Sequence, residues 1–168
     1  MMWRNDQVSR QETKIICEYA KKSLVFDGDF VEMGCYKGDT SMLLAEVLRL
    51  SDKKLWIYDS FEGLPKKSVA DNSALGVDFR EGELFVTKRE VKERFLRAGI
   101  KVPIIKKAWF NDLVDEDLPT KIAFAFLDGD FYESIRDSLR LIEKKIVKGS
   151  TVIVHDYNND FLLYRFHK

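Results

Sequence analysis

The chain has 168 residues, of which 45% are hydrophobic and 12% aromatic, so it is long enough for one domain with a buried core. Lysine plus arginine and aspartate plus glutamate each number 28, a balance that disfavours nucleic acid and anionic membranes as partners. No apolar stretch approaches the roughly 20 residues of a membrane span. Residues 1–10 also lack the apolar segment of a secretory signal, so we expect the protein in the cytoplasm. From the length we expect a single domain over residues 1–168.

The first third of the chain is predicted to form helix, strand, helix and strand. Ser9 is placed to cap a lead-in helix within residues 1–24, where apolar residues recur at helical spacing. Phe30–Met33 is a short apolar strand, and an apolar helix over Met42–Leu50 follows it after a glycine turn. Leu55–Tyr58 is a second strand, and the acidic residue Asp59 follows it directly.

The rest of the chain continues the alternation with two helices and three strands. In chain order they are Lys88–Ala98, Val102–Ile105, Ile122–Leu127, about Glu133 to Ile146, and Val152–Val154. Residues 66–85 have no convincing periodicity, and we read them as a loop or lid. Strands that alternate with helices predict an α/β domain whose parallel sheet has helices on both faces.

A glycine turn follows the first strand: Glu32 to Gly38 has the form E-x-G-x-x-x-G. Glycines let a ligand approach the backbone, and the next helix offers free N–H groups at its positive end. A carboxylate at Glu32 disfavours a pyrophosphate, and with it a nicotinamide dehydrogenase. It favours a cationic amine or ribose hydroxyls, which S-adenosylmethionine carries. Taken alone, the turn is equally compatible with an ordinary strand-to-helix connection.

Two further features belong to the same hypothesis of a nucleoside pocket. Asp59 ends the second strand, where an acid typically binds ribose hydroxyls, although it is also a candidate turn or capping residue. Trp109 and Phe110 are candidates for sandwiching adenine, but aromatic side chains more often pack in the core.

Acidic residues follow two later strands. Asp128 and Asp130 come directly after Ile122–Leu127, and Asp156 follows Val152–Val154. Because the carboxyl ends of parallel strands meet at one edge of a sheet, these carboxylates are expected to converge on a site for a hard metal or for acid/base chemistry. If the chain stays extended through Gly129, the side chains of Asp128 and Asp130 lie on one face. The alternative is that these acids cap the following helix or occupy turns.

Four segments carry specific motifs in a fixed order, across about residues 25 to 157. They are Phe30-Val31-Glu32-Met33-Gly34 with Gly38, Tyr58-Asp59-Ser60-Phe61-Glu62-Gly63-Leu64-Pro65, Leu127-Asp128-Gly129-Asp130-Phe131-Tyr132-Glu133-Ser134, and His155-Asp156-Tyr157. In sequence and spacing they resemble the macrocin O-methyltransferase (TylF-like) family.

The resemblance implies a Rossmann-like three-layer α/β sandwich of the class I methyltransferases. It also implies a reaction: S-adenosylmethionine methylates a hydroxyl of a sugar in a glycan, nucleotide-sugar or natural product, with Mg²⁺ or Mn²⁺ as a further cofactor. Carried over by position, Asp130 is the general base, and Asp128 and Asp156 are metal ligands. The cofactor-binding residues are Glu32, Gly34, Tyr36, Gly38, Asp59, Ser60, Phe61 and Asp128.

The chain departs from the family pattern in two places. His155 stands where the family usually has the first of two acids, and an imidazole there either suits a transition metal better than Mg²⁺ or simply packs. The family also predicts a further helix and a final pair of strands after Tyr157, of which Phe161 to Phe166 could supply one strand or a helical turn.

A C-terminally shortened sheet would expose apolar surface near its fifth strand, which favours a homo-oligomer. Two alternative functions stay open. One is methylation of a non-sugar acceptor, such as a phenol or an amine. The other is a catalytically inert relative that binds a nucleoside and acts through binding or assembly.

Overall fold

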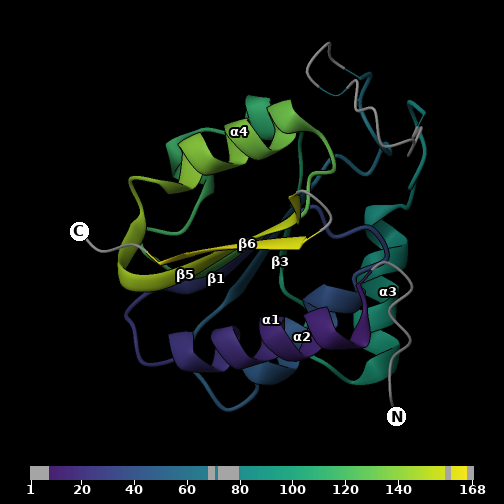
Figure 1. The fold of residues 1–168 in the computed structure, drawn as a ribbon. Helices are drawn as coiled ribbons and strands as arrows, with labels where there is room; N and C mark the ends of the chain where they lie inside the picture. The colour runs from purple at the N-terminus through teal and green to yellow at the C-terminus, as the bar shows by residue number, and fades with distance from the viewer. Residues whose placement is uncertain (1–7, 68–70, 72–79, 158–159, 166–168) are drawn as a thin grey trace.

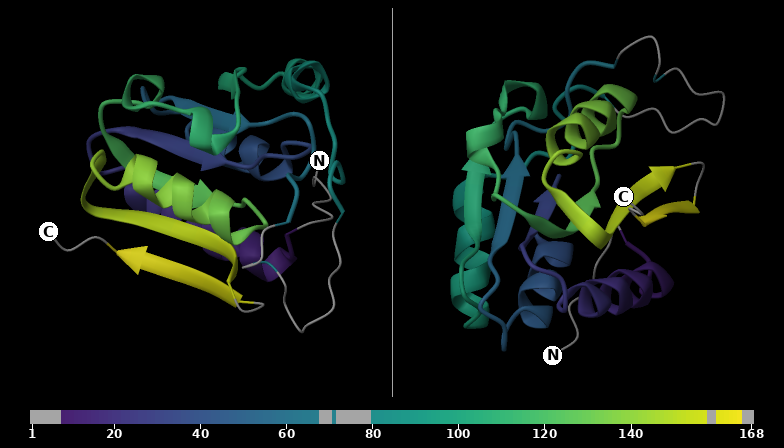
Figure 2. Two further views of the ribbon diagram at one scale, coloured as in Figure 1. Left: turned by 90° about the horizontal axis from the view of Figure 1, so that it is seen from above. Right: turned by 90° about the vertical axis from the view of Figure 1, so that its left-hand side faces the viewer.

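A single six-stranded sheet forms the centre of the molecule, with its strands in the order β3-β2-β1-β4-β5-β6. The computed structural model describes residues 8–67, 71, 80–157 and 160–165, and only the backbone of residues 156–165. The strands are β1 (Asp29–Met33), β2 (Leu55–Asp59), β3 (Ile104–Lys107), β4 (Ile122–Leu127), β5 (Ile146–Tyr157) and β6 (Asp160–Arg165). Strands β1 to β5 pair in parallel, whereas β6 pairs antiparallel with β5 and forms the edge opposite β3 (Figure 2).

Helices cover both faces of this sheet (Figure 1). They are α1 (Arg10–Ser23), α2 (Asp39–Val47), α3 (Lys88–Ala98) and α4 (Tyr132–Ile142), with two short 3₁₀ turns, η2 (Phe110–Asp112) and η3 (Asp115–Asp117). Helices α1, α2 and α3 lie on one face, and α4 lies on the other. The expected three-layer, Rossmann-like α/β arrangement is therefore confirmed.

Strand β4 explains why the sheet needs cover on both faces, since all six of its side chains are buried. Phe124 and Phe126 pack into the cluster under α1 to α3, whereas Ala125 and Leu127 pack into the cluster on the α4 side. Successive side chains of a strand point to opposite faces, so a continuous apolar run such as Ile122–Leu127 is stable only between two helical layers.

The lead-in helix was predicted correctly. Ser9 and Glu12 form a capping box at the start of α1, in which each side chain bonds the backbone N–H of the other residue. Ile16 and Ala20, four positions apart, are fully buried against the sheet. The capping box and the apolar stripe together set where α1 begins and which of its faces is covered.

Several predicted boundaries were wrong. Helix α2 starts at Asp39 instead of Met42, with Gly38 as its N-cap. Strand β3 lies two residues later than predicted, at Ile104–Lys107. Helix α4 ends at Ile142 because the chain from Ile146 joins β5, where Ile146 pairs with Ile122 of β4. Pairing with a neighbouring strand thus overrides local helical spacing at this point.

Two expectations concern segments at the limits of the description. Most of the expected lid, residues 68–70 and 72–79, lies outside the described residues. The tail forms β6, which is the strand alternative of the two we considered.

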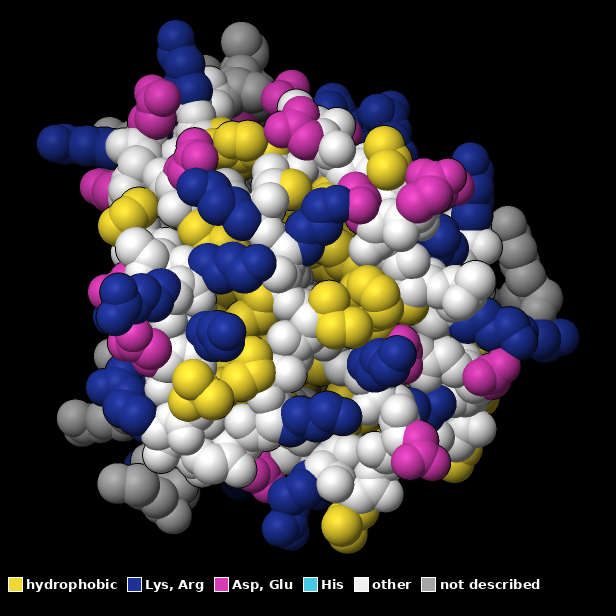
Figure 3. Space-filling model, turned by 180° about the vertical axis from the view of Figure 1, so that it is seen from behind, with side chains coloured by type: hydrophobic (Ala, Val, Ile, Leu, Met, Phe, Trp, Pro, Cys, Tyr) yellow, Lys and Arg dark blue, Asp and Glu magenta, His cyan; other side chains and the backbone are white. Residues whose placement is uncertain are grey.

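None of the described helices is long and apolar enough to cross a membrane. On the face shown in Figure 3, side chains of both charges occur with hydrophobic ones between them, in keeping with a formal net charge of zero.

The strand order reverses between β1 and β4. From β1, the chain adds β2 and β3 on one side of the sheet, and it then returns to add β4 and β5 on the other side. In open α/β sheets ligands bind at the carboxyl ends of the strands at this switch point. The two strand ends approach closely here: a Cβ added to Gly34 would lie 1.9 Å from the carbonyl oxygen of Asp128. Gly34 also has a φ of +86°, a conformation that other residues rarely adopt.

Gly34→Ala should therefore lower the free energy of unfolding by about 3 kcal/mol or more, since it combines backbone strain with overlap against a neighbouring backbone. Gly99→Ala is a matched control, because Gly99 has a φ of +67° but open space around its Cβ position. Urea unfolding should show a loss of only about 1–2 kcal/mol for the control. Equal losses for the two variants would contradict the close approach at Gly34.

Candidate active site

A cavity of about 390 Å³ lies at the carboxyl ends of β1, β2, β4 and β5. That volume falls within the range of small-molecule sites. Among the predicted site residues, those that line it are Glu32, Gly34, Tyr36, Asp59, Ser60, Asp128 and Asp130. The structure thus brings together residues that are up to 98 positions apart in the sequence, counting from Glu32 to Asp130.

Three predicted site residues have other surroundings. Gly38 does not line the cavity and serves as the N-cap of α2, with a φ of +82°. Phe61 does not line it either, since its side chain is buried in the cluster under α1 to α3. Asp156 lies in β5, but its side chain is outside the described part of the structure.

Asp59 holds the glycine turn in place. Its Oδ2 accepts hydrogen bonds from the backbone amides of Cys35 at 2.9 Å and Tyr36 at 3.2 Å, and its Oδ1 accepts one from the amide of Phe61 at 2.8 Å. Asp59 is thus both the turn residue that the sequence allowed and a bridge between the ends of β1 and β2. A carboxylate has about four acceptor positions, so one remains for a ligand hydroxyl.

Glu32 is fully buried and lines the cavity. Within the described part of the chain, neither of its carboxylate oxygens has a hydrogen-bond partner. The pKa of Glu32 is raised to about 8, mainly by burial; a contact with the Ser41 hydroxyl partly opposes the rise, and the nearby Asp128 and Asp59 carboxylates add to it. A buried carboxyl group without a partner is costly to a folded protein, so this one is available for a donor group of a ligand.

The turn after β4 bends at Asp130. Asp130 has a φ of +56°, so the chain bends at this residue, directly after Gly129. Asp128 and Asp130 nevertheless both line the cavity. Asp128 is held by its backbone amide, which donates to the carbonyl of Met33 at 2.8 Å, and by its carboxylate, which lies 3.0 Å from Nδ1 of His155.

The structure also tests the alternative that these acids only cap the next helix. The N-cap of α4 is Phe131, which makes no side-chain capping bond. The first amide of the helix, that of Tyr132, donates instead to Asp71 at 2.7 Å. Neither Asp128 nor Asp130 is therefore the N-cap residue of α4.

Aromatic side chains flank the same cavity. Trp109 and Phe110 both line it and are half-buried, so they lie at the boundary between core and pocket. Phe110 packs against the cluster on the α4 side and also begins η2. This position is compatible with stacking on a flat ring.

Several residues of the site were not predicted from the sequence. Arg94 of α3 donates to the Lys37 carbonyl and, at 2.5 Å, to the Asp39 carboxylate, so it pins the turn that follows β1. Glu133 and Asp137, four positions apart on α4, line the cavity. The i, i+4 spacing was a visible signal for the last two residues. For Arg94 the sequence held no signal, because its partner lies 55 positions away.

Three comparisons place the chain among known proteins. The family model for macrocin O-methyltransferase (TylF) matches residues 12–163. A 4'-O-methyltransferase of 8-demethyl-8-(2,3-dimethoxy-alpha-L-rhamnosyl)-tetracenomycin-C from Streptomyces olivaceus is 32% identical over 85% of this chain and 59% of its own length. The demethyldecarbamoylnovobiocin O-methyltransferase of Streptomyces niveus is 30% identical over 77% of this chain and 53% of its own.

Solved structures give the same picture of the fold. The O-methyltransferase NovP superposes with a TM-score of 0.76 at 27% identity, covering 87% of this chain and 64% of NovP. The calicheamicin methyltransferase CalS11 superposes with a TM-score of 0.70 at 17% identity, which shows the fold alone; 90% of this chain and 68% of CalS11 are covered. The chain spans between 53% and 59% of the length of the curated relatives that it matches.

Glu32→Gln keeps the shape of the side chain and removes its ionisation. In the wild type the pKa of Glu32 rises from 4.5 to about 8 on folding. The stabilisation that comes from binding a proton at Glu32 in the folded state is therefore complete below about pH 4.5, and it is lost as the pH rises through about 8. Between about pH 5 and about pH 8.5, the unfolding free energy of the variant should rise relative to wild type by up to about 4 kcal/mol.

Urea unfolding at a series of pH values measures this difference. Glu83→Gln serves as the control, because Glu83 is exposed. It should follow the wild-type pH profile. A pH-independent difference between Glu32→Gln and wild type would show that Glu32 is not the desolvated acid of the site.

Proposed function

Because the chain belongs to the macrocin O-methyltransferase family, we propose that it transfers a methyl group from S-adenosylmethionine to a hydroxyl of a sugar-containing acceptor. Relatives at 32% and 30% identity bear the names of O-methyltransferases of glycosylated natural products. A glycosylated small molecule is accordingly the proposed acceptor, in preference to a free glycan.

The observation that carries the proposal is the unpartnered Glu32 carboxyl group at the wall of the cavity. S-adenosylmethionine offers an ammonium group, ribose hydroxyls and an adenine ring, each of which has a counterpart among the lining residues. Glu32 suits the ammonium group, the remaining acceptor position of Asp59 suits a ribose hydroxyl, and Trp109 suits the adenine. Gly34, Tyr36 and Ser60 complete the proposed cofactor wall.

S-adenosylmethionine, when bound, supplies a methyl group made electrophilic by its sulfonium centre. The residues of this chain bind and orient the reactants and accept one proton. We assign Asp130 as the general base: its carboxylate would take the proton of the acceptor hydroxyl as the oxygen bonds to the methyl carbon, while the bond from that carbon to sulfur breaks and S-adenosylhomocysteine leaves. Asp130 sits at a bend of the chain on the cavity wall, where an acceptor can reach it.

The proposed metal site, Asp128 with Asp156, has less support in the structure. Among the described residues, no group of three carboxylate, imidazole or thiolate side chains is arranged to hold an ion. The Asp128 carboxylate lies beside His155, and a site for Mg²⁺ or Mn²⁺ would depend on the side chain of Asp156. Asp128 and Asp156 remain the proposed ligands.

Asp130→Asn should leave the cofactor affinity within about twofold of wild type while methyl transfer falls by about 100- to 10,000-fold, because an amide does not accept the proton. Asparagine tolerates the left-handed conformation at this position, so the variant should fold. The assay measures transfer of a labelled methyl group from S-adenosylmethionine to demethyldecarbamoylnovobiocin or to a rhamnosyl-tetracenomycin. Asp115→Asn, an exposed residue outside the cavity lining, should keep full activity.

Calorimetry with S-adenosylhomocysteine completes the test, with and without Mg²⁺ or Mn²⁺. Failure of the wild type to bind it would refute the methyltransferase proposal. Binding without turnover of any acceptor would favour the inert, nucleoside-binding alternative. If Asp130→Asn retains turnover, another group is the base.

A further inference from the structure

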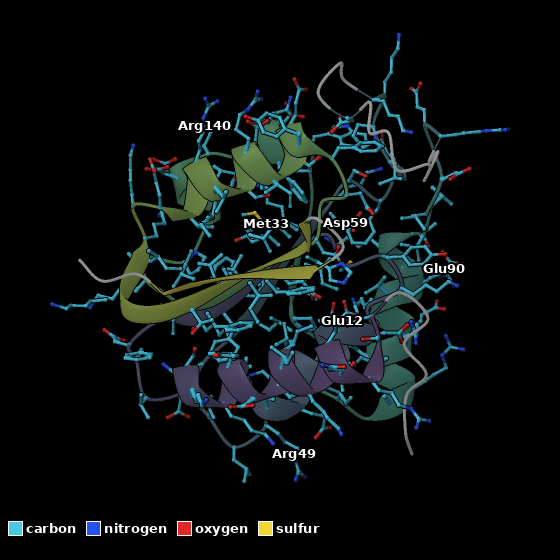
Figure 4. All side chains as sticks on the ribbon, viewed as in Figure 1. Glu12, Met33, Arg49, Asp59, Glu90 and Arg140 are labelled. Carbon is cyan, nitrogen blue, oxygen red and sulfur yellow. The ribbon has the colours of Figure 1, made fainter. Side chains whose placement is uncertain are left out.

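A buried histidine connects the start of α1 to the acidic strand ends. The His155 side chain is 6% exposed and lines the cavity. Each of its ring nitrogens has a carboxylate beside it, from Asp128 on one side and Glu12 on the other. Glu12 lies on the first turn of α1 and is labelled between that helix and the sheet in Figure 4. Three elements, β5, the turn after β4 and α1, therefore meet at this one ring.

On one side, the ring holds the carboxylate of Asp128. Nδ1 of His155 lies 3.0 Å from Oδ1 of Asp128, which is a hydrogen-bond distance. Opposite an ionised Asp128, which only accepts hydrogen bonds, Nδ1 is the donor. The Asp128 backbone is separately tied to Met33 of β1. The position of Asp128 is thus set by β1, and the orientation of its carboxylate by β5.

On the other side, Glu12 faces the ring from a fixed position. Its Oε1 lies 3.6 Å from Nε2 of His155, which is too long for a hydrogen bond but within ion-pair range. Its Oε2 accepts a hydrogen bond from the backbone amide of Ser9 at 2.6 Å and so completes the capping box of α1. The Glu12 carboxylate therefore caps the N-terminus of α1 and also faces the imidazole of His155.

Packing alone does not account for a histidine at this place. The ring lies 5.9 Å from the ring of Phe126, and an apolar side chain would make such a contact without desolvating two polar nitrogens. Here carboxylates lie on both sides of the ring, that of Asp128 at hydrogen-bond distance from Nδ1 and that of Glu12 within ion-pair range of Nε2. The arrangement suits a ring whose function is to hold another side chain.

We propose that His155 and Glu12 are positioning residues, which together hold the Asp128 carboxylate in one orientation on the wall of the cavity. Neither residue is a catalytic residue, since each acts through Asp128. The consequence for activity rests on the methyl transfer proposed above, whereas the arrangement of the three side chains does not. Helix α1 then contributes to the site as well as covering the sheet.

Nitrogen-15 NMR of the imidazole rings tests the arrangement without any substrate. The chain has only two histidines, His155 and His167, so one His167→Ala variant assigns the spectrum. We expect a protonated Nδ1 in His155, and we expect Glu12→Gln to shift its ring signals. Ser9→Ala is the matched control, because it removes the other half of the capping box and leaves the Glu12 carboxylate. It should leave the His155 signals in place.

An unprotonated Nδ1 in wild type would overturn the proposed bond to Asp128. Equal shifts in Glu12→Gln and Ser9→Ala would show that the signals report fraying of α1, and this result would also overturn the proposal. Both outcomes are independent of whether the protein is a methyltransferase.

The activity test uses His155→Leu, which keeps an apolar side chain in the same space and removes both polar contacts. We expect kcat to fall by about 10- to 100-fold, the usual effect of losing a partner that orients a site residue, with S-adenosylhomocysteine affinity within about twofold of wild type. His155→Asn should recover part of the rate, because its amide can donate to Asp128 from near the Nδ1 position.

Glu12→Gln should lower kcat in the same direction. Combined with His155→Leu it should add no further loss, because Glu12 acts only through His155. Additive losses, or a rise in the KM for S-adenosylmethionine at unchanged kcat, would overturn the positioning role. If the wild type binds no S-adenosylhomocysteine, the methyl-transfer proposal fails separately and the NMR result alone decides the arrangement.

Discussion

The contact between Gly34 and Asp128 is the constraint on which the site depends. Because Gly34 has no Cβ, the backbone at the end of β4 can lie directly against the turn after β1. The same turn is tied to β2, since the Gly34 amide donates to the Tyr58 carbonyl at 2.9 Å. Three strand ends are thereby drawn together, and the acids that follow them share one cavity. A larger residue at this position would separate the acids before any chemistry could use them.

Bringing carboxylates together in a partly dry cavity is unfavourable, and the chain offsets this cost differently for each acid. Asp59 is stabilised by three backbone amides, Asp39 by Arg94, and Asp128 by His155. Glu32 is the exception within the described residues, and its raised pKa is the result. The protein therefore satisfies its structural acids internally and leaves one buried acid facing the ligand space.

Backbone strain is concentrated at the same place. Four described residues other than glycine have positive φ angles, and three of them, Tyr36, Leu84 and Asp130, line the cavity. Such conformations persist only where the surrounding structure enforces them, and they are common at functional sites. At Asp130 the bend occurs at the proposed general base, on the wall of the cavity. Aspartate is one of the few residues besides glycine that adopt the left-handed conformation this bend needs.

Sequence patterns were sufficient for the strands and for the identity of most lining residues. The apolar runs of β1, β2 and β4 predict buried parallel strands wherever they occur, and Glu32, Asp59 and Asp128 are recognisable as acids in or directly after such strands. The end of α4 was not predictable in this way, because pairing of Ile146 with β4 competes with local helical spacing. Likewise, only the fold decides that Asp59 binds backbone amides, that Arg94 reaches Asp39, and that Glu12 faces His155. Periodicity reports which face of an element is buried, whereas the partner of a polar side chain depends on how distant segments approach one another, and that approach is set by packing of the whole domain.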